Sequence, residues 1–256
     1  GDLFAFKQDH IFKDWDDVKA NANNRYDAIG ELYGPAAWEA LKDKAGKQPI
    51  EPGDVCWADL NNDGVINNLD RVKVGNLFPT VTGGFSTTLG YKDFSLYARF
   101  DYALGHTLYN DLAARSLGQY QGSFNIIDMV KDSWSETNQN TDIPKFYYAD
   151  QLSKKNITRS NNGLTAVDNN SSRFYEKGDY LALREITLTW NLPKKWINKA
   201  LMSNASVYVT GQNLFYITGY TGVSPEPAVD TTYGQGLDNG RYPTPKTVLL
   251  GLSVTF

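Results

Sequence analysis

The chain has a single cysteine, Cys56, so no disulfide can form within it. This excludes a small secreted scaffold held together by disulfides and leaves the cellular compartment open. Histidine is almost as rare: there are two, His10 and His106, and neither has a metal-binding or catalytic pattern beside it in the sequence. We expect both histidines at surface or interfacial positions, and Cys56 as a half-buried small apolar residue.

Long apolar runs and basic clusters are also missing. No run of 18 apolar residues occurs, which excludes a transmembrane helix. With a net charge of −4 and no cluster of Lys and Arg, the chain offers no footprint for nucleic acid. Nucleophile elbows, P-loops and zinc spacings are absent, and nothing singles out Asp101 and Glu185 as the carboxylate pair of a glycoside hydrolase. We therefore expect no enzyme and no catalytic residue.

Period-two alternation of apolar and polar residues is the strongest positive signal. In the last strand, 245–256, five apolar side chains share one face: Val248, Leu250, Leu252, Val254 and Phe256. Small and polar residues occupy the other face, with Leu249 as the exception. This length fits a strand that crosses a bilayer at a tilt, and a terminal aromatic residue is common in the closing strand of bacterial outer-membrane barrels. The aromatic content of 13% suits a barrel with interfacial aromatic girdles.

Four earlier segments show the same alternation, at 82–91, 94–105, 180–192 and 206–217. The first two are joined by Lys92-Asp93, which predicts a two-residue hairpin. The polar faces of these segments carry charged residues, which indicates a wet or plugged lumen rather than a dry core. We expect an all-β fold, the C-terminal segment of an antiparallel transmembrane β-barrel with about five strands.

Long polar loops separate these strands at 106–178 and 218–242, and we expect an irregular extracellular loop region at 1–78. Counted back from a last strand that runs down into the periplasm, both short turns fall on the periplasmic side and both long loops on the extracellular side. We expect short helices at 14–20, after an acidic cap, and at 36–42, with Pro35 at its first position.

An EF-type calcium loop is predicted at 59–70, inside the irregular region. Oxygen ligands stand at loop positions one, three and five, and Gly64 at six permits the sharp turn. Asp70 replaces the long bidentate Glu of position twelve, which predicts weaker binding. The alternative is an Asn/Asp/Gly-rich turn without metal. The candidate ligands of a structural Ca²⁺, or of Mg²⁺, are Asp59, Asn61, Asp63, Val65 (through its carbonyl), Asn67 and Asp70.

Five strands are too few to close a transmembrane barrel, for which eight is about the minimum. No basic start followed by an apolar core is visible near Gly1, although an outer-membrane protein needs a signal peptide. We therefore expect this chain to be the C-terminal piece of something longer, whose plug domain and earlier strands it does not contain.

Several motifs together resemble the C-terminal part of the SusC/RagA family of TonB-dependent outer-membrane transporters. The most specific is Val-Tyr-Val-Thr-Gly-Gln-Asn-Leu-Phe at 207–215. The other matching segments are 52–54, 70–72, 74–76, 89–94, 134–138, 140–144, 178–184, 242–247 and the terminal Phe256. The resemblance covers essentially the whole chain.

This resemblance implies a large plugged barrel that imports oligosaccharides or peptides together with a SusD-like surface lipoprotein. TonB would drive import through the N-terminal part of the protein. The expected partners are thus the remainder of the transporter, the lipoprotein, TonB, the substrate and the lipid bilayer. The alternative is a soluble cell-surface β-sandwich that binds glycans and carries a dockerin-like calcium loop. It explains the aromatic residues and the metal loop, but not the one-sided topology.

Overall fold

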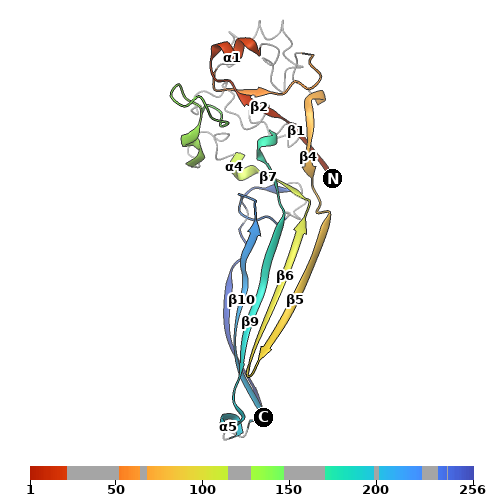
Figure 1. Ribbon diagram of the computed structural model, residues 1–256, viewed down its shortest axis with the longest axis vertical. Helices are drawn as coiled ribbons and strands as arrows, with labels where there is room; N and C mark the ends of the chain where they lie inside the picture. The colour runs from red at the N-terminus through yellow and green to blue at the C-terminus, as the bar shows by residue number, and fades with distance from the viewer. Residues whose placement is uncertain are drawn as a thin grey trace.

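The structure is a computed structural model that describes residues 1–21, 52–63, 68–114, 128–146, 171–198, 202–226, 236–240 and 242–256. A tall sheet occupies one half of the molecule, and several small sheets and short helices form an upper body above it (Figure 1). Among the described residues, no helix is both long enough and apolar enough to span a membrane.

The tall sheet consists of the five strands that alternation predicts. Adjacent strands in this sheet are all antiparallel, and the strand order is β12-β10-β9-β6-β5. The strands are β5 (Val81–Tyr91), β6 (Phe94–Leu104), β9 (Tyr180–Asn191), β10 (Asn204–Thr218) and β12 (Thr247–Thr255). The all-β prediction is confirmed, and each strand lies within two residues of its predicted bounds.

The connections between these strands divide by length, as predicted. The two-residue turn after β5 and the connection that carries α5 (Lys194–Ile197) lie at the lower end, with the C-terminus (Figure 1). Lys92 in the tight turn has a φ of 54°, the left-handed conformation that short hairpin turns require. The two long connections lie at the other end and lead into the upper body.

The register places apolar residues opposite one another across all five strands. Antiparallel partners share a face of the sheet, so each row of partners belongs to one face. Two rows of one face are Tyr91, Phe94, Trp190, Val207 and Leu252, and then Leu89, Leu96, Leu188, Val209 and Leu250. Leu250 is 80% exposed and Leu89 is 61% exposed, so the described residues leave these parts of the apolar face uncovered.

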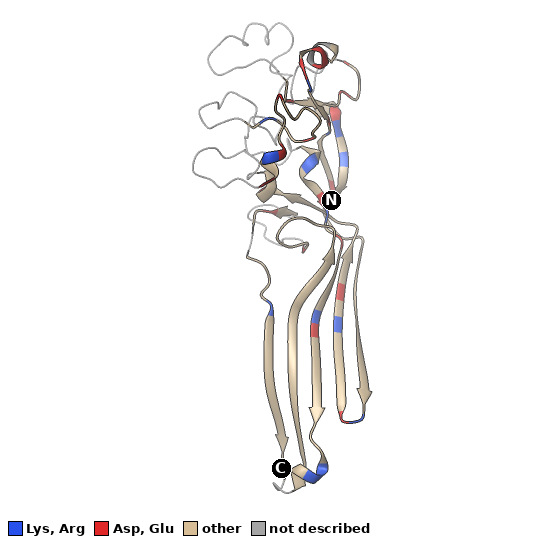
Figure 2. Cartoon of the chain, turned by 60° about the vertical axis from the view of Figure 1, so that its left-hand side comes forward, with Lys and Arg blue, Asp and Glu red and all other residues tan. Residues whose placement is uncertain are grey.

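The opposite face is polar. Two of its rows are Ser95, Thr189 and Tyr208, and then Ser86, Arg99, Glu185, Gln212 and Thr247. Charged side chains on the sheet gather near mid-height and above, while the lower strands are almost free of charge (Figure 2). One apolar and one polar face fit a barrel wall between lipid and lumen.

Aromatic rings gather at the lower end of the apolar face. Phe94 and Trp190 stack with ring centroids 6.1 Å apart, and Trp196 of α5 meets Trp190 edge-on at 5.9 Å. Aromatic residues at this height are typical of the interfacial girdle of an outer-membrane barrel, where an amphipathic ring meets the headgroups.

The upper body is built from short strands that the sequence alone did not indicate. The pairs β1 (Asp2–Phe6) with β4 (Arg71–Asn76) and β2 (Gln8–Ile11) with β3 (Val55–Trp57) lie in the region expected to be irregular. Segments β7 (Thr107–Asn110), β8 (Tyr175–Lys177) and β11 (Leu237–Asp238) form a further sheet from the two predicted loops. The other described elements of the upper body are α1 (Trp15–Ala20), α4 (Asp111–Ala114) and the 3₁₀ turns η2 (Asn68–Asp70), η4 (Asp128–Asp132) and η7 (Ser172–Phe174).

Most of the buried core lies in this upper body. Tyr109, Ala114, Ile143 and Phe174 form one cluster, with Phe6 against Trp57 nearby. Helix α1 confirms the prediction at 14–20: Asp14 is its N-cap and accepts from the Asp17 N–H at 2.9 Å. The helix predicted at 36–42 lies outside the described residues.

Candidate functional site

The predicted metal loop at 59–70 folds back on itself through its acidic side chains. Asp59 Oδ1 and Asn61 Oδ1 both accept from the Asp63 N–H, at 3.2 and 3.1 Å. Asn61 donates to Asp63 Oδ2 at 2.8 Å, so three of the predicted ligands adjoin one another. Asp70 is fully buried and accepts from the Leu60 N–H at 2.9 Å, which closes the loop.

The donor set of this loop suits a hard cation, since Ca²⁺ and Mg²⁺ prefer oxygen ligands. The carboxylate oxygens of Asp59, Asp63 and Asp70 do not all come within 4.8 Å of one another. Val65 and Asn67, the two other predicted ligands, lie outside the described residues. The metal site therefore stays a prediction, with four of its six ligands in one closed loop.

A second polar site lies on the polar face of the sheet, where β9 contains a bulge. Arg99 pairs with Glu185, but the next residue of β6, Phe100, pairs with Leu183, so Arg184 is an extra residue. Strict alternation would place Arg184 on the apolar face with Ile186. The bulge instead turns it to the polar face, which is a recurrent use of bulges.

Arg184 holds two strands and a loop together from this position. Its Nε lies 2.8 and 2.7 Å from the two carboxylate oxygens of Asp101 on β6, and its Nη1 donates to the Tyr216 hydroxyl on β10 at 3.1 Å. Its Nη2 pairs with Glu226, to which the Tyr216 hydroxyl also donates at 2.9 Å. The guanidinium also lies over the Tyr180 and Tyr216 rings, 6.0 and 5.6 Å from their centroids.

Both acidic partners remain partly open to solvent. The Arg184 side chain is 15% exposed, while those of Asp101 and Glu226 are 37% and 30% exposed. An open hollow of about 570 Å³ adjoins the group and is lined by Gly83, Gly84, Phe85, Ser86, Arg99, Phe100, Asp101 and Arg184. The hollow thus has two arginines and one carboxylate in its lining, which makes it a charged, hydrogen-bonding surface on the polar face.

A third group fastens the loop after β10 to the small sheet of the upper body. Tyr220 is 7% exposed and donates to Asp238 Oδ2 at 2.7 Å. The pKa of the Tyr220 hydroxyl is raised above its ordinary value, mainly by burial and further by the hydrogen bond to Asp238, because both favour the neutral form. Glu176 accepts from the Thr221 N–H at 2.9 Å on the same side.

The structure corrects three expectations about single residues. His106 is 1% exposed, with Nε2 2.9 Å from the Pro225 carbonyl, so it is neither a surface nor an interfacial residue. Cys56 is fully rather than half buried. His10 does have a cluster of possible ligands around it, because pairing of β2 with β3 brings Cys56 opposite it.

A TonB-dependent receptor (P3) of Formosa agariphila is 32% identical over 243 residues, which are 90% of this chain and 22% of the relative. Receptor P26 of the same organism is 32% identical over 82% of this chain, and SusC of Bacteroides thetaiotaomicron is 26% identical over 86%. The chain belongs to the family of TonB-dependent receptors. It spans about a fifth of the length of these curated relatives. No protein-family model matches it.

Solved structures agree on the fold of this TonB-dependent receptor chain. The RagAB peptide transporter aligns with a TM-score of 0.60 at 24% identity, covering 80% of this chain and 21% of that one. The RagAB importer in its closed-closed state aligns at 0.61 and 20% identity, covering 99% and 23%. These likenesses show the barrel fold alone. The recognition as the C-terminal part of such a transporter is confirmed, and nothing supports the β-sandwich alternative.

We predict that the Arg184 group of the receptor stabilises the sheet as a unit. Arg184→Met leaves two carboxylates facing each other and should lower the free energy of unfolding by roughly 1–3 kcal/mol, between the values for surface and buried ion pairs. Combining it with Asp101→Asn should cost less than the two single effects added, which a double-mutant cycle by denaturant titration of the receptor in lipid vesicles measures.

Arg99→Met is the matched control for this cycle, because Arg99 is exposed on the same face of β6. It should change stability by less than about 0.5 kcal/mol. Strictly additive effects of Arg184→Met and Asp101→Asn would show that the contacts do not act together.

We predict a pH-dependent contribution from Tyr220. The pKa of Tyr220 is higher in the folded than in the unfolded state. Its contribution to the free energy of unfolding is therefore complete below about pH 10, the unfolded-state pKa, and is lost as the pH rises from there through the folded-state pKa. At pH 8 Tyr220→Phe should be about 1–2 kcal/mol less stable than wild type, and the gap should shrink above about pH 10. Denaturant titrations from pH 8 to 11 measure this gap. The control Tyr242→Phe alters a 94% exposed tyrosine and should be as stable as wild type at every pH. A stability difference between Tyr220→Phe and wild type that stays constant with pH would contradict the role given to the Tyr220 hydroxyl.

Proposed function

We propose that this chain forms part of a TonB-dependent outer-membrane importer that takes up oligosaccharides or peptides with a SusD-like surface lipoprotein. The observation that carries the proposal is the sheet itself, whose rows alternate between a continuous apolar face and a polar one over five strands. Such a sheet fits the wall of a barrel with lipid outside and a hydrated lumen inside. The relatives named as TonB-dependent receptors support the same function.

In this proposal the lower end of the sheet lies in the periplasm, and so does the C-terminus. Short turns belong on the periplasmic side of outer-membrane barrels and long loops on the extracellular side, which agrees with the division of connections seen in Figure 1. The upper body then faces the outside of the cell, where the lipoprotein covers the mouth and substrate enters.

The remaining partners follow from the edges and faces of the sheet. Strands β12 and β5 are its two edge strands, and an open edge in lipid would leave backbone groups unpaired. The other strands of the barrel pair with these edges, the plug fills the lumen against the polar face, and TonB acts through the N-terminal part of the protein. We assign no catalytic role to any residue, in keeping with relatives named as receptors.

We predict that loss of the full-length receptor abolishes uptake of one class of nutrient. A strain that lacks the gene should lose growth on a defined oligosaccharide or on a defined peptide mixture, and the intact gene should restore it. Growth on free monosaccharides and amino acids is the control, since smaller uptake routes serve it. The receptor should also leave the membrane fraction only with detergent; release without detergent, or unchanged uptake of every oligosaccharide and peptide, would refute the proposal.

We also propose that the loop at 59–70 binds Ca²⁺, or Mg²⁺, as a structural ion. Asp59→Asn and Asp63→Asn each remove a charged oxygen ligand and should weaken binding at least about tenfold, as measured by calorimetry on the chelator-treated receptor. Asp128→Asn is the control, because Asp128 is exposed and pairs with Lys131 in a different turn. Equal affinities for all three variants and wild type would identify the loop as an Asn/Asp/Gly-rich turn without metal.

A further inference from the structure

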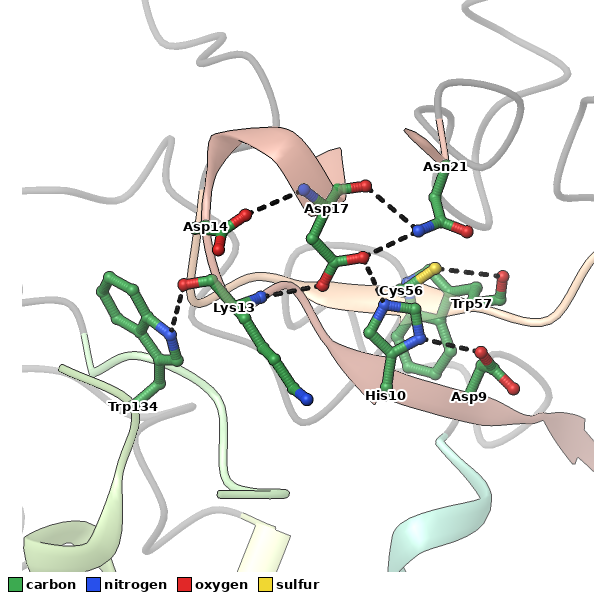
Figure 3. Close-up of polar contacts among 9 residues, drawn as sticks. All are labelled: Asp9, His10, Lys13, Asp14, Asp17, Asn21, Cys56, Trp57 and Trp134. Atoms are coloured by element: carbon green, nitrogen blue, oxygen red, sulfur yellow. Dashed lines mark hydrogen bonds and ion pairs between the residues drawn. The ribbon is translucent and has the colours of Figure 1, made fainter. Parts of the chain in front are cut away.

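A mixed cluster of nitrogen, oxygen and sulfur ligands lies in the upper body, away from the metal loop and from Arg184. Asp9, His10 and Cys56 each offer one ligand atom, and these atoms all lie within 4.8 Å of one another. Figure 3 shows the three side chains on one side of the β2–β3 pair, below the first turn of α1. Cys56 is fully buried, His10 is partly buried and Asp9 is exposed, so the cluster extends from the core to the surface.

The pairing of β2 with β3 accounts for this cluster. His10 and Cys56 are direct partners in the antiparallel register, so their side chains leave the pair on the same side. Gln8 pairs with Trp57, the neighbour of Cys56, which makes Asp9 the extra residue of a bulge. The bulge turns Asp9 toward His10, and its Oδ2 lies 2.8 Å from His10 Nδ1.

Both ring nitrogens of His10 face a carboxylate. Nδ1 lies 2.8 Å from Asp9 Oδ2, and Nε2 lies 3.2 Å from Asp17 Oδ1. A neutral imidazole carries one N–H and can donate to one carboxylate only. The other nitrogen then turns a lone pair toward an anion, which calls for a second proton or for a metal cation at that position.

Asp17 is fixed as the partner of Nε2. Its Oδ2 accepts from the Lys13 N–H at 2.9 Å, and its Oδ1 accepts from Asn21 Nδ2 at 2.8 Å. These contacts fix the carboxylate beside Nε2, where it can accept the Nε2–H of an imidazole whose Nδ1 binds a metal ion. A carboxylate that receives the far N–H of a histidine is the usual support of a metal-bound imidazole, and here it leaves Nδ1 free to bind a cation beside Asp9 and Cys56.

We propose that Asp9, His10 and Cys56 bind a divalent transition-metal ion of the zinc type, with Asp17 as the positioning residue. Asp9 Oδ2, His10 Nδ1 and Cys56 Sγ supply the three protein ligands, and solvent at the exposed Asp9 side completes a tetrahedron. Cys56 binds as the thiolate and releases its proton on binding. A thiolate and an imidazole select against Ca²⁺ and Mg²⁺, so this site and the loop at 59–70 take different ions.

The ion would join β2, through Asp9 and His10, to β3, through Cys56, with α1 connected to it by the contact of Asp17 with His10. Without an ion this part of the sheet is small, because β3 has three residues and pairs only with β2. A metal that binds only the folded arrangement stabilises it by mass action. The site therefore serves to hold this part of the upper body in shape, whichever nutrient the receptor imports.

The test uses the full-length receptor, purified in detergent and freed of metal with a chelator. Zn²⁺ is titrated at pH 7 in competition with a chromophoric chelator, and Co²⁺ is added in a parallel sample to report a thiolate-to-cobalt charge-transfer band. Wild type should bind about one Zn²⁺ at this site and show the band. Cys56→Ser should abolish the band, and Cys56→Ser and His10→Gln should each lose this equivalent of zinc.

Asp17→Asn distinguishes a positioning role from a merely structural one. It should retain the zinc stoichiometry and the cobalt band but weaken affinity by about 10–100-fold. Asp16→Asn, next to it on α1, should bind zinc as wild type does. Limited proteolysis confirms that each variant is folded, and His10→Gln, at a partly exposed position, serves if Cys56→Ser fails to fold. Wild-type zinc affinity in His10→Gln, or a wild-type receptor that takes up no zinc and shows no cobalt band, overturns the proposal.

Discussion

The strict two-residue period of a β-strand is the constraint on which the rest of this structure depends. Because successive side chains point to opposite faces, an apolar row can continue across five strands only if every register agrees. Shifting β9 by one residue would turn Leu188 to the polar face, and shifting β10 would do the same to Val209. The same constraint gives the sheet an apolar face and a polar face, which suits a sheet that lies between lipid and water.

Charged clusters arise where this period is interrupted. The bulge in β9 turns Arg184 away from the apolar face and into contact with Asp101 and Glu226. The bulge in β2 turns Asp9 toward His10 in the same way. Each bulge adds one residue to a strand and turns a charged side chain toward other polar groups. The two bulges thus lie at the two sites for which contacts beyond regular strand pairing are described above, one in the tall sheet and one in the upper body.

The five long strands, the hairpin at Lys92-Asp93 and helix α1 were predictable because local patterns specify them. The short strands of the upper body were not, because three-residue segments such as β3 and β8 carry too little alternation to distinguish them from loops. The sequence contains one local sign of the Arg184 site: alternation assigns this charged residue to the apolar face of β9, which indicates a bulge. Its partner Glu226 left none, since only the folded loop after β10 brings it near. His10 and Cys56 likewise meet through a pairing that spacing in the sequence does not reveal.

The unequal connections at the two ends of the sheet also have a consequence for the order of assembly. Strands β5 and β6 are joined by two residues, whereas about 75 residues separate β6 from β9, its other neighbour. Each doubling of a loop costs roughly 0.6 kcal/mol of closure entropy, and distant contacts form late. We therefore expect the β5–β6 and β9–β10 hairpins to form before β6 pairs with β9, because only the two hairpins are closed by short connections.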